Sequence, residues 1–347
     1  MLDWYDKNRR VLPWRATETE RRNPYYTWLS EIMLQQTTVQ AVVPYFLKFT
    51  QKWPDIQALA NADDDEVMAA WAGLGYYARA RNLLKCARTI ASPAFNCRFP
   101  ETRRELEMLP GIGPYTSAAI TSIAFDRPAV VIDGNIERVV SRLFAIETPL
   151  PDSESEILEK ASVLSESRED RPGDFAQSLM DIGATICTPT RPKCFSCPII
   201  QDCKAYAKGI QNEIPNKKAK AQKPLREGDV YWIEDGQGHV LFEKRPDTNM
   251  LGGMTGLPSS GWDNKADPNF KRPDLETLLK KISPAPQQEN EVVKHTFTHF
   301  HLKLRIKNFQ TIKKLDLPDT FFWVLKNDVH NIGLPTLFKK VVKTKNL

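Results

Sequence analysis

Long apolar runs are absent from the chain. No segment approaches the roughly 18 consecutive apolar residues that a membrane-spanning helix needs. The first ten residues, Met1–Arg10, carry charges of both signs and contain no apolar core, so they do not resemble a secretory signal. Internal repeats and extended low-complexity tracts are also missing. These absences predict a cytoplasmic protein with no membrane partner.

Cysteine is scarce outside one short segment. Four of the six cysteines lie within residues 187–203: Cys187, Cys194, Cys197 and Cys203. Four thiolates in one loop suit a single [4Fe–4S] cluster, because each iron needs one external sulfur ligand. Zinc is the alternative, since zinc sites with four cysteine ligands also contain a C-x2-C element. Without a signal peptide, a disulfide framework is the weaker explanation.

Alternating strand patterns are rare in the first part of the chain. Apolar residues at helical spacing predict helices over Tyr25–Lys48 (kinked or ended by Pro44), Asp63–Trp71, Arg103–Leu109, Tyr115–Phe125, Ile136–Phe144, Glu154–Ser165 and Phe175–Gly183. The chain has 347 residues, of which 41% are hydrophobic, so it is long enough for two cores. We therefore expect an all-α domain over residues 1–207.

After Pro215 the pattern changes to short strands between glycine-rich turns. Predicted strands are Asp229–Ile233, Gly238–Lys244, His299–Phe309 and Thr320–Val324, with one helix over Asp274–Ile282. This indicates a smaller α+β domain over residues 228–347. We expect residues 208–227 to form a basic linker, because there are six basic residues and one acid between Lys208 and Arg226. A solvated linker and a segment that follows phosphates both fit this composition.

Two glycines stand in a turn between predicted helices, in the segment Leu109–Thr116. Gly111 and Gly113 permit a tight turn whose backbone N–H groups open at the start of the second helix. That geometry suits a DNA phosphate, and the helix dipole adds to the attraction. A simple helix–helix turn is the alternative.

Two acidic residues are candidates for chemistry. Glu31 lies beside apolar side chains on a predicted helix, four residues before Gln35, and such surroundings raise the proton affinity of a carboxylate. Asp133 and Asn135 precede an apolar helix, where either could act only as a helix cap. For Glu31 the alternative is an ordinary surface glutamate on an amphipathic helix.

The motifs, in their order along the chain, resemble those of the adenine DNA glycosylase (MutY-type) branch of the endonuclease III, or helix-hairpin-helix, superfamily. Besides the cysteine loop and the glycine turn, the resemblance rests on Leu12–Arg15, Gly73–Asn82, Val131–Asn135, Phe175–Ala184 and His295–Leu302. It therefore covers nearly the whole chain. It implies a helix-hairpin-helix glycosylase domain with an iron–sulfur cluster loop at 187–203, followed by a Nudix-like domain.

The resemblance implies a division of labour between two carboxyl groups. Glu31 matches the acid that protonates adenine N7, and Asp133 matches the carboxylate that stabilises the cationic sugar, in the general logic of glycoside hydrolysis. Asn135 and Tyr115 match polar residues that support this site. Bifunctional members carry a lysine in place of Tyr115, and a phenol cannot form the Schiff base. Base removal without efficient strand cleavage is therefore expected.

The resemblance also implies DNA contacts. The target base must leave the stack, and four residues match positions that act on the opened duplex or surround the extruded adenine: Gln35, Tyr76, Arg15 and Gln177. Glu137 stands where some relatives carry a lysine, a departure that bears on substrate cross-linking rather than on activity. The implied partner is duplex DNA with 8-oxoguanine:adenine or guanine:adenine mispairs, bound by a monomer that associates with the nucleoid in a bacterium.

The second domain resembles the Nudix-like module that this family uses to recognise 8-oxoguanine. Phe297, Thr298 and His299 match its Phe-Ser-His segment, with threonine in place of serine. Threonine keeps a hydroxyl that donates and accepts, so hydrogen bonding is expected to be retained, although the extra methyl can alter the fit. The glutamate cluster of Nudix hydrolases is missing, so nucleotide hydrolysis by this domain is not expected.

Overall fold

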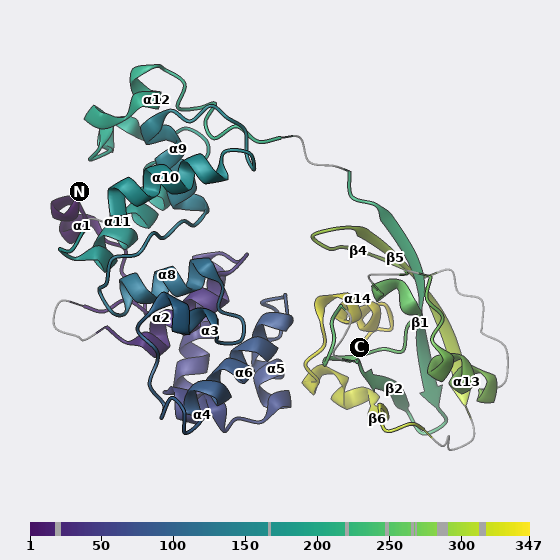
Figure 1. Cartoon of the computed structure of the whole chain (residues 1–347). Helices are drawn as coiled ribbons and strands as arrows, with labels where there is room; N and C mark the ends of the chain where they lie inside the picture. The colour runs from purple at the N-terminus through teal and green to yellow at the C-terminus, as the bar shows by residue number, and fades with distance from the viewer. Residues whose placement is uncertain are drawn as a thin grey trace. The chain divides into compact units, whose positions relative to one another are not determined.

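The computed structural model describes residues 1–17, 22–165, 168–218, 222–246, 250–264, 267, 269–282, 291–311 and 317–347. The chain folds into two units (Figure 1). The first comprises residues 1–61 and 82–220, and the second comprises residues 62–81 and 221–347. Of the basic stretch considered above, Lys220 lies outside the described residues. No described helix is long and apolar enough to cross a bilayer.

The first unit is helical, as the sequence predicts. Its described helices are α1 (Leu2–Asn8), α2 (Pro24–Leu34), α3 (Val39–Lys52), α4 (Ile56–Ala60), α6 (Ala78–Ala91, which begins in the second unit), α7 (Arg103–Glu107), α8 (Pro114–Ile123), α9 (Gly134–Phe144), α10 (Glu154–Ser165), α11 (Pro172–Thr185) and α12 (Lys204–Ala207). The predicted helix over Tyr25–Lys48 is two helices. The break falls at 35–38, where Thr38 caps α3, and Pro44 lies inside α3 instead of ending it.

One apolar core of this unit is built from α8, α9, α10 and α11. Ala118, Ile136, Val140, Ile157 and Ile182 are among its buried residues. Helix α11 contacts both α8 and α9, and α2 contacts α8 (Figure 1). Because α8 contacts α2, and α11 contacts both α8 and α9, side chains that are far apart in sequence can share one site.

The second unit contains a six-stranded mixed sheet. Its strands are β1 (Leu225–Asp235), β2 (His239–Lys244), β3 (Thr255–Gly256), β4 (Val292–Thr296), β5 (His301–Thr311) and β6 (Phe321–Leu325). The order is β3-β2-β1-β5-β4, and β6 pairs with β2. Strands β1 and β5 are parallel over their full length, from Leu225 opposite His301 to Asp235 opposite Thr311, whereas the other pairs are antiparallel.

Each face of this sheet is covered by a helix: α13 (Pro273–Lys281) on one face and α14 (Thr336–Thr344) on the other (Figure 1). Val240 and Phe242 of β2 pack with α14, while Leu241 between them packs with α13. This alternation follows from the two-residue period of a strand. Helix α5 (Asp64–Trp71), capped by Asp63, belongs to the same unit. The sequence reasoning identified α13 but missed α14 and β4.

Candidate active site

Glu31 lies on the buried side of α2 and is only 6% exposed. The hydroxyl of Tyr115, in the first turn of α8, donates a hydrogen bond of 2.7 Å to its Oε2. Burial raises the pKa of Glu31 to about 7, and the charge of Asp133 acts in the same direction; the Tyr115 hydrogen bond and the Arg15 charge oppose them. Glu31 is therefore protonated in a large fraction of molecules near neutral pH, as a general acid requires.

Asp133 is the N-cap of α9. Its Oδ1 accepts from the backbone N–H groups of Asn135 (3.0 Å) and Ile136 (2.7 Å), and its Oδ2 accepts from Nδ2 of Asn135 (2.7 Å). These donors and the helix dipole stabilise the negative charge of the carboxylate. The capping function considered for Asp133 is therefore real, and it coexists with a position close enough to Glu31 for the two charges to interact.

A pocket opens beside Glu31. Its lining combines apolar side chains with a few polar groups: Arg10, Leu12, Trp14, Arg15, Thr27, Ser30, Glu31, Leu34, Val39, Ile123, Gln177 and Met180. Arg15 and Gln177, which the sequence predicts around an extruded base, both lie here. An apolar cavity with convergent polar groups and a carboxyl of raised pKa is the usual form of a small-ligand site.

Asp181 is a buried residue of this region that sequence reasoning did not single out. Its carboxylate accepts two hydrogen bonds from Arg15, at 2.7 and 2.8 Å, and further bonds from the side chain and backbone N–H of Arg10. In the sequence, Asp181 is an aspartate on the apolar face of the helix predicted over Phe175–Gly183. A charge in such a place needs a partner, and this was the one indication that Asp181 is paired.

The glycine turn leads into α8. Gly111 has φ +77°, and a Cβ there would lie 2.8 Å from Cβ of Asn82, so this position requires glycine. Gly113 is the N-cap of α8 with extended backbone, and a Cβ there would meet nothing within 4 Å. The N-cap glycine thus places no side chain over the start of α8. Gln35, predicted to contact the duplex, donates from Nε2 to Thr116 Oγ1 at 3.2 Å.

Arg138 connects Asn135 to the cysteine loop. Its guanidinium donates to Asn135 Oδ1 at 3.0 Å and to the carbonyl oxygens of Cys187 and Gly183, each at 2.6 Å. Gly183 packs directly on Asn135, because a Cβ on this glycine would lie 2.6 Å from Cβ of Asn135. The amide that contacts Asp133 is therefore held from two sides.

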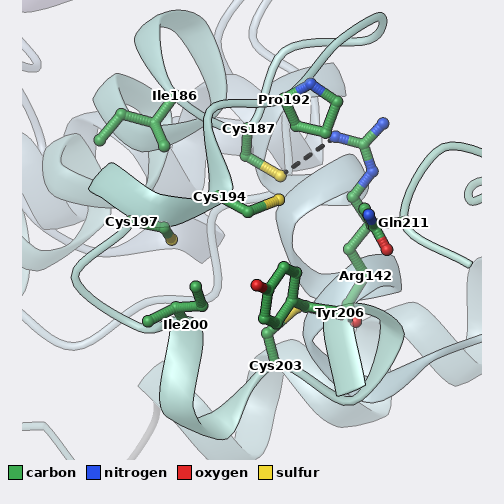
Figure 2. Close-up of a pocket in the computed structure, with 10 residues that line it drawn as sticks. All are labelled: Arg142, Ile186, Cys187, Pro192, Cys194, Cys197, Ile200, Cys203, Tyr206 and Gln211. Atoms are coloured by element: carbon green, nitrogen blue, oxygen red, sulfur yellow. Dashed lines mark hydrogen bonds between the residues drawn. The ribbon is translucent and has the colours of Figure 1, made fainter. Parts of the chain in front are cut away.

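The four loop cysteines line one pocket (Figure 2), together with Arg142, Ile186, Pro192, Ile200, Tyr206 and Gln211. Arg142 donates to Sγ of Cys187 at 3.3 Å and also bonds the carbonyl oxygens of Thr188, Pro189 and Ile214. Burial raises the pKa of the Cys197 thiol to about 11. Four thiols around one pocket beside a fixed guanidinium fit a thiolate-ligated group that carries negative charge.

In the second unit, Phe297 lies in the turn between β4 and β5. Its ring stacks on Trp262, with centroids 5.8 Å apart, and its N–H bonds the carbonyl oxygen of Phe300 at 2.9 Å. Thr298 and His299 at the tip are exposed. Within the same unit, the hydroxyl of Tyr76 lies 2.5 Å from Oγ1 of Thr298. The unit thus brings together four residues for which the resemblance implies contact with the lesion or the opened duplex.

Comparisons with known proteins agree with this arrangement. The chain matches a family model of helix-hairpin-helix superfamily base excision DNA repair proteins over residues 29–164 and a Nudix domain model over residues 229–344. A solved structure of a thermostable thymine-DNA glycosylase is 30% identical in sequence and superposes with a TM-score of 0.52. The match covers 60% of this chain and 93% of the chain in that structure.

Two relatives named adenine DNA glycosylase match nearly the whole chain. The one from Arabidopsis thaliana is 34% identical over 98% of this chain, which spans 63% of that relative's length. The one from Buchnera aphidicola (subsp. Schizaphis graminum) is 34% identical over 99% of this chain and 96% of its own length. The chain therefore belongs to the adenine DNA glycosylase family, within the helix-hairpin-helix superfamily of base excision repair proteins.

Proposed function

We propose that this DNA glycosylase hydrolyses the N-glycosidic bond of adenine paired with 8-oxoguanine or guanine in duplex DNA, acting as a monomer in the compartment that holds the DNA. The observation that carries the proposal is the buried carboxyl of Glu31, bonded to Tyr115 in a pocket beside Asp133. Two carboxyl groups, one protonated and one ionised, are what glycosidic cleavage requires.

Glu31 and Asp133 divide the chemistry. With the flipped adenine in the pocket, Glu31 donates its proton to N7, which makes the base a better leaving group. Asp133 stabilises the positive charge that develops on the sugar, because its carboxylate is already oriented by the cap of α9 and by Asn135. After the bond breaks, the ionised Glu31 accepts a proton from the attacking water.

Tyr115 restricts the reaction to base removal. Its phenol is bonded to Glu31 and has no amine to attack the sugar, so no imine forms and no elimination follows. The hydroxyl donates to the ionised form of Glu31 and so opposes the effect of burial on its pKa. The expected product is an abasic site in an intact strand.

Recognition of 8-oxoguanine is assigned to the tip of the β4–β5 turn. The stacking of Phe297 on Trp262 anchors the turn in the unit, and Thr298 and His299 at its tip are exposed. In the proposed complex, these two side chains offer polar atoms to the base opposite adenine. The hydroxyl of Thr298 supplies the donor and acceptor that a serine would supply. Tyr76, bonded to Thr298, adds an aromatic ring at the same place.

The four loop cysteines are proposed to hold one [4Fe–4S] cluster. Arg142 offsets part of the negative charge of the thiolates through its bond to Cys187. When bound, the cluster would hold the loop in one conformation. It would take no part in the cleavage of the glycosidic bond. Through Arg138, the carbonyl oxygen of Cys187 is joined to Asn135, so the loop supports the active site by position.

The test is single-turnover excision from an 8-oxoguanine:adenine duplex, with a guanine:thymine duplex as the comparison substrate. We expect adenine release, an intact strand until alkali treatment, and no thymine release. Glu31→Gln should lower the excision rate at least about 100-fold, within the range for general acids, without loss of duplex binding. Full excision by this variant would refute the assigned acid, and cleavage of thymine in preference to adenine would refute the substrate.

A further inference from the structure

The ion pair between Asp181 and Arg15 lies next to the proposed acid. Asp181 is on α11 with a fully buried side chain, and the Arg15 side chain is 9% exposed. Two parallel hydrogen bonds join their planar groups, from Nη1 of Arg15 to Oδ2 and from Nη2 to Oδ1. A bidentate pair of this kind fixes both the position and the orientation of the guanidinium.

Asp181 holds a second arginine as well. Arg10 donates to it from the backbone N–H at 3.0 Å and from Nε. Arg10 and Arg15 both line the pocket that contains Glu31. One buried carboxylate therefore attaches the segment that carries both arginines to α11, on the wall of the pocket where the base is expected.

Arg15 also acts on Glu31 through its charge. Three groups act on the pKa of Glu31: Tyr115 on α8, Asp133 before α9, and Arg15 in the N-terminal segment between α1 and α2. Of these, Arg15 carries the positive charge, which favours the ionised form of the acid. An arginine without a counterion in this buried place would favour the ionised form of Glu31, against burial and the Asp133 charge, which favour the protonated form.

We propose that Asp181 is a positioning residue for catalysis: its carboxylate holds Arg15 away from ion pairing with Glu31 and offsets its charge, so that Glu31 retains a proton near neutral pH. The inference rests on the proposed role of Glu31 as the acid. Arg15 can then line the base pocket without neutralising the group that protonates the base. Asp181 itself is not among the residues that line the pocket beside Glu31.

Asp181→Asn in the full chain tests the proposal, because asparagine keeps the shape and removes the charge. Single-turnover excision is measured against pH. An acid must be protonated, so the rate falls as pH rises through its pKa. In this variant that alkaline limb should move about one pH unit lower, from about pH 7 to about pH 6, which makes excision about tenfold slower at pH 8, about twofold slower at pH 6 and little changed at about pH 5. Asp174→Asn, on the same helix and paired with Arg22 and Arg171, is the matched control and should not move the limb.

A variant of Arg15, the other member of the ion pair, should shift the alkaline limb in the opposite direction. Arg15→Gln removes the positive charge and should move the alkaline limb to higher pH, and the double variant Arg15→Gln with Asp181→Asn should return it to within about half a pH unit of the parent. This arm also stands if Asp181→Asn alone fails to fold, as judged by circular dichroism. A limb unmoved in both single variants, or an equal rate loss at every pH, would overturn the proposal.

Failure of the inference is separable from failure of the proposed function. If Glu31→Gln abolishes excision while the Asp181 and Arg15 variants leave the limb in place, only the positioning role is lost. If Glu31→Gln retains full activity, the acid assignment itself is wrong. Binding of an uncleavable duplex by each variant shows whether Arg15 acts through substrate affinity, which would change the dissociation constant and leave the limb unmoved.

Discussion

Glu31 lies among side chains that do not favour a charge. Its neighbours on α2, Trp28, Leu29 and Ile32, are almost completely buried. Tyr115 gives the carboxyl a hydrogen bond, yet burial still raises the pKa of Glu31 to about 7. The property that makes Glu31 an acid near neutral pH therefore also makes it unfavourable for folding once it is ionised.

This cost predicts a pH-dependent stability effect for Glu31→Gln. The folded-state pKa of Glu31 is above its ordinary value of 4.5. The free energy of unfolding therefore has its full value, as far as Glu31 is concerned, below about pH 4.5, and it falls as the pH rises to about 7 and beyond, because Glu31 must then ionise in a buried place. The variant should match the parent in acid and exceed it by about 1–3 kcal/mol at pH 8. Urea unfolding at the two pH values measures this; equal differences at both would contradict it.

At the same scale, the sequence predicted part of the site. Glu31, Asp133, Tyr115 and Asn135 were found from motifs, and the structure joins them by hydrogen bonds and charge. Asp181 was overlooked, because an acid in an apolar helix gives no sign of its partner until the chain is folded. Its partners, Arg10 and Arg15, lie near the other end of the first unit's sequence.

Among the elements, the contact between α9 and α11 positions the Asp133 cap. Asn135 at the start of α9 packs on Gly183 near the end of α11, and the two are bridged by Arg138. A helical glycine is normally less favourable than alanine. Here the absence of a side chain is what permits the close approach.

Gly183→Ala is accordingly expected to destabilise. The new methyl would lie 2.6 Å from Cβ of Asn135 and 2.9 Å from its backbone oxygen, so α9 and α11 must separate. Overpacking of this kind costs about 1–3 kcal/mol, and excision should fall because Asn135 shifts against Asp133. Thermal unfolding and single-turnover rates check both effects. Gly236→Ala, where a Cβ meets nothing within 4 Å, is the control; a Gly183 variant as stable and active as the parent would contradict this account.

Element prediction succeeded where the apolar period was long and clear. α10 has the predicted bounds, and α5, α8 and α9 differ from prediction by one or two residues at their ends. The predicted break between α2 and α3 was wrong. Pro44 predicted a kink or an end, but it lies inside α3, and the new helix begins after its N-cap, Thr38. α14 was missed although its apolar face packs on the sheet.

For the whole molecule, the function that we propose places the chemistry and the recognition of the opposite base in different units. Glu31 and Asp133 belong to the first unit, and Thr298 belongs to the second. A change in the second unit should therefore alter the choice of mispair and leave the chemical step unchanged.

Thr298→Val in the full chain tests this separation, because valine keeps the shape and removes the hydroxyl. Loss of one hydrogen bond should lower the preference for 8-oxoguanine:adenine over guanine:adenine duplexes by about three- to tenfold. The limiting excision rate at saturating enzyme should remain that of the parent. Thr296→Val, two residues away on β4 and bonded to His301, is the matched control. A lower limiting rate with unchanged preference would reject the assignment.

The sequence by itself determined the helical first part and the later α+β part, because periodicity is a local property. The order of the motifs, through the family resemblance, predicted the roles of the four-cysteine loop and of the two carboxyl groups. Only the tertiary structure decided which groups meet. The proton affinity of Glu31 depends on burial and on charges from Asp133 and Arg15, and Asp181 has its partners only after α11 packs against the N-terminal segment. Electrostatic interactions act through space, so they are set by folding rather than by position in the chain.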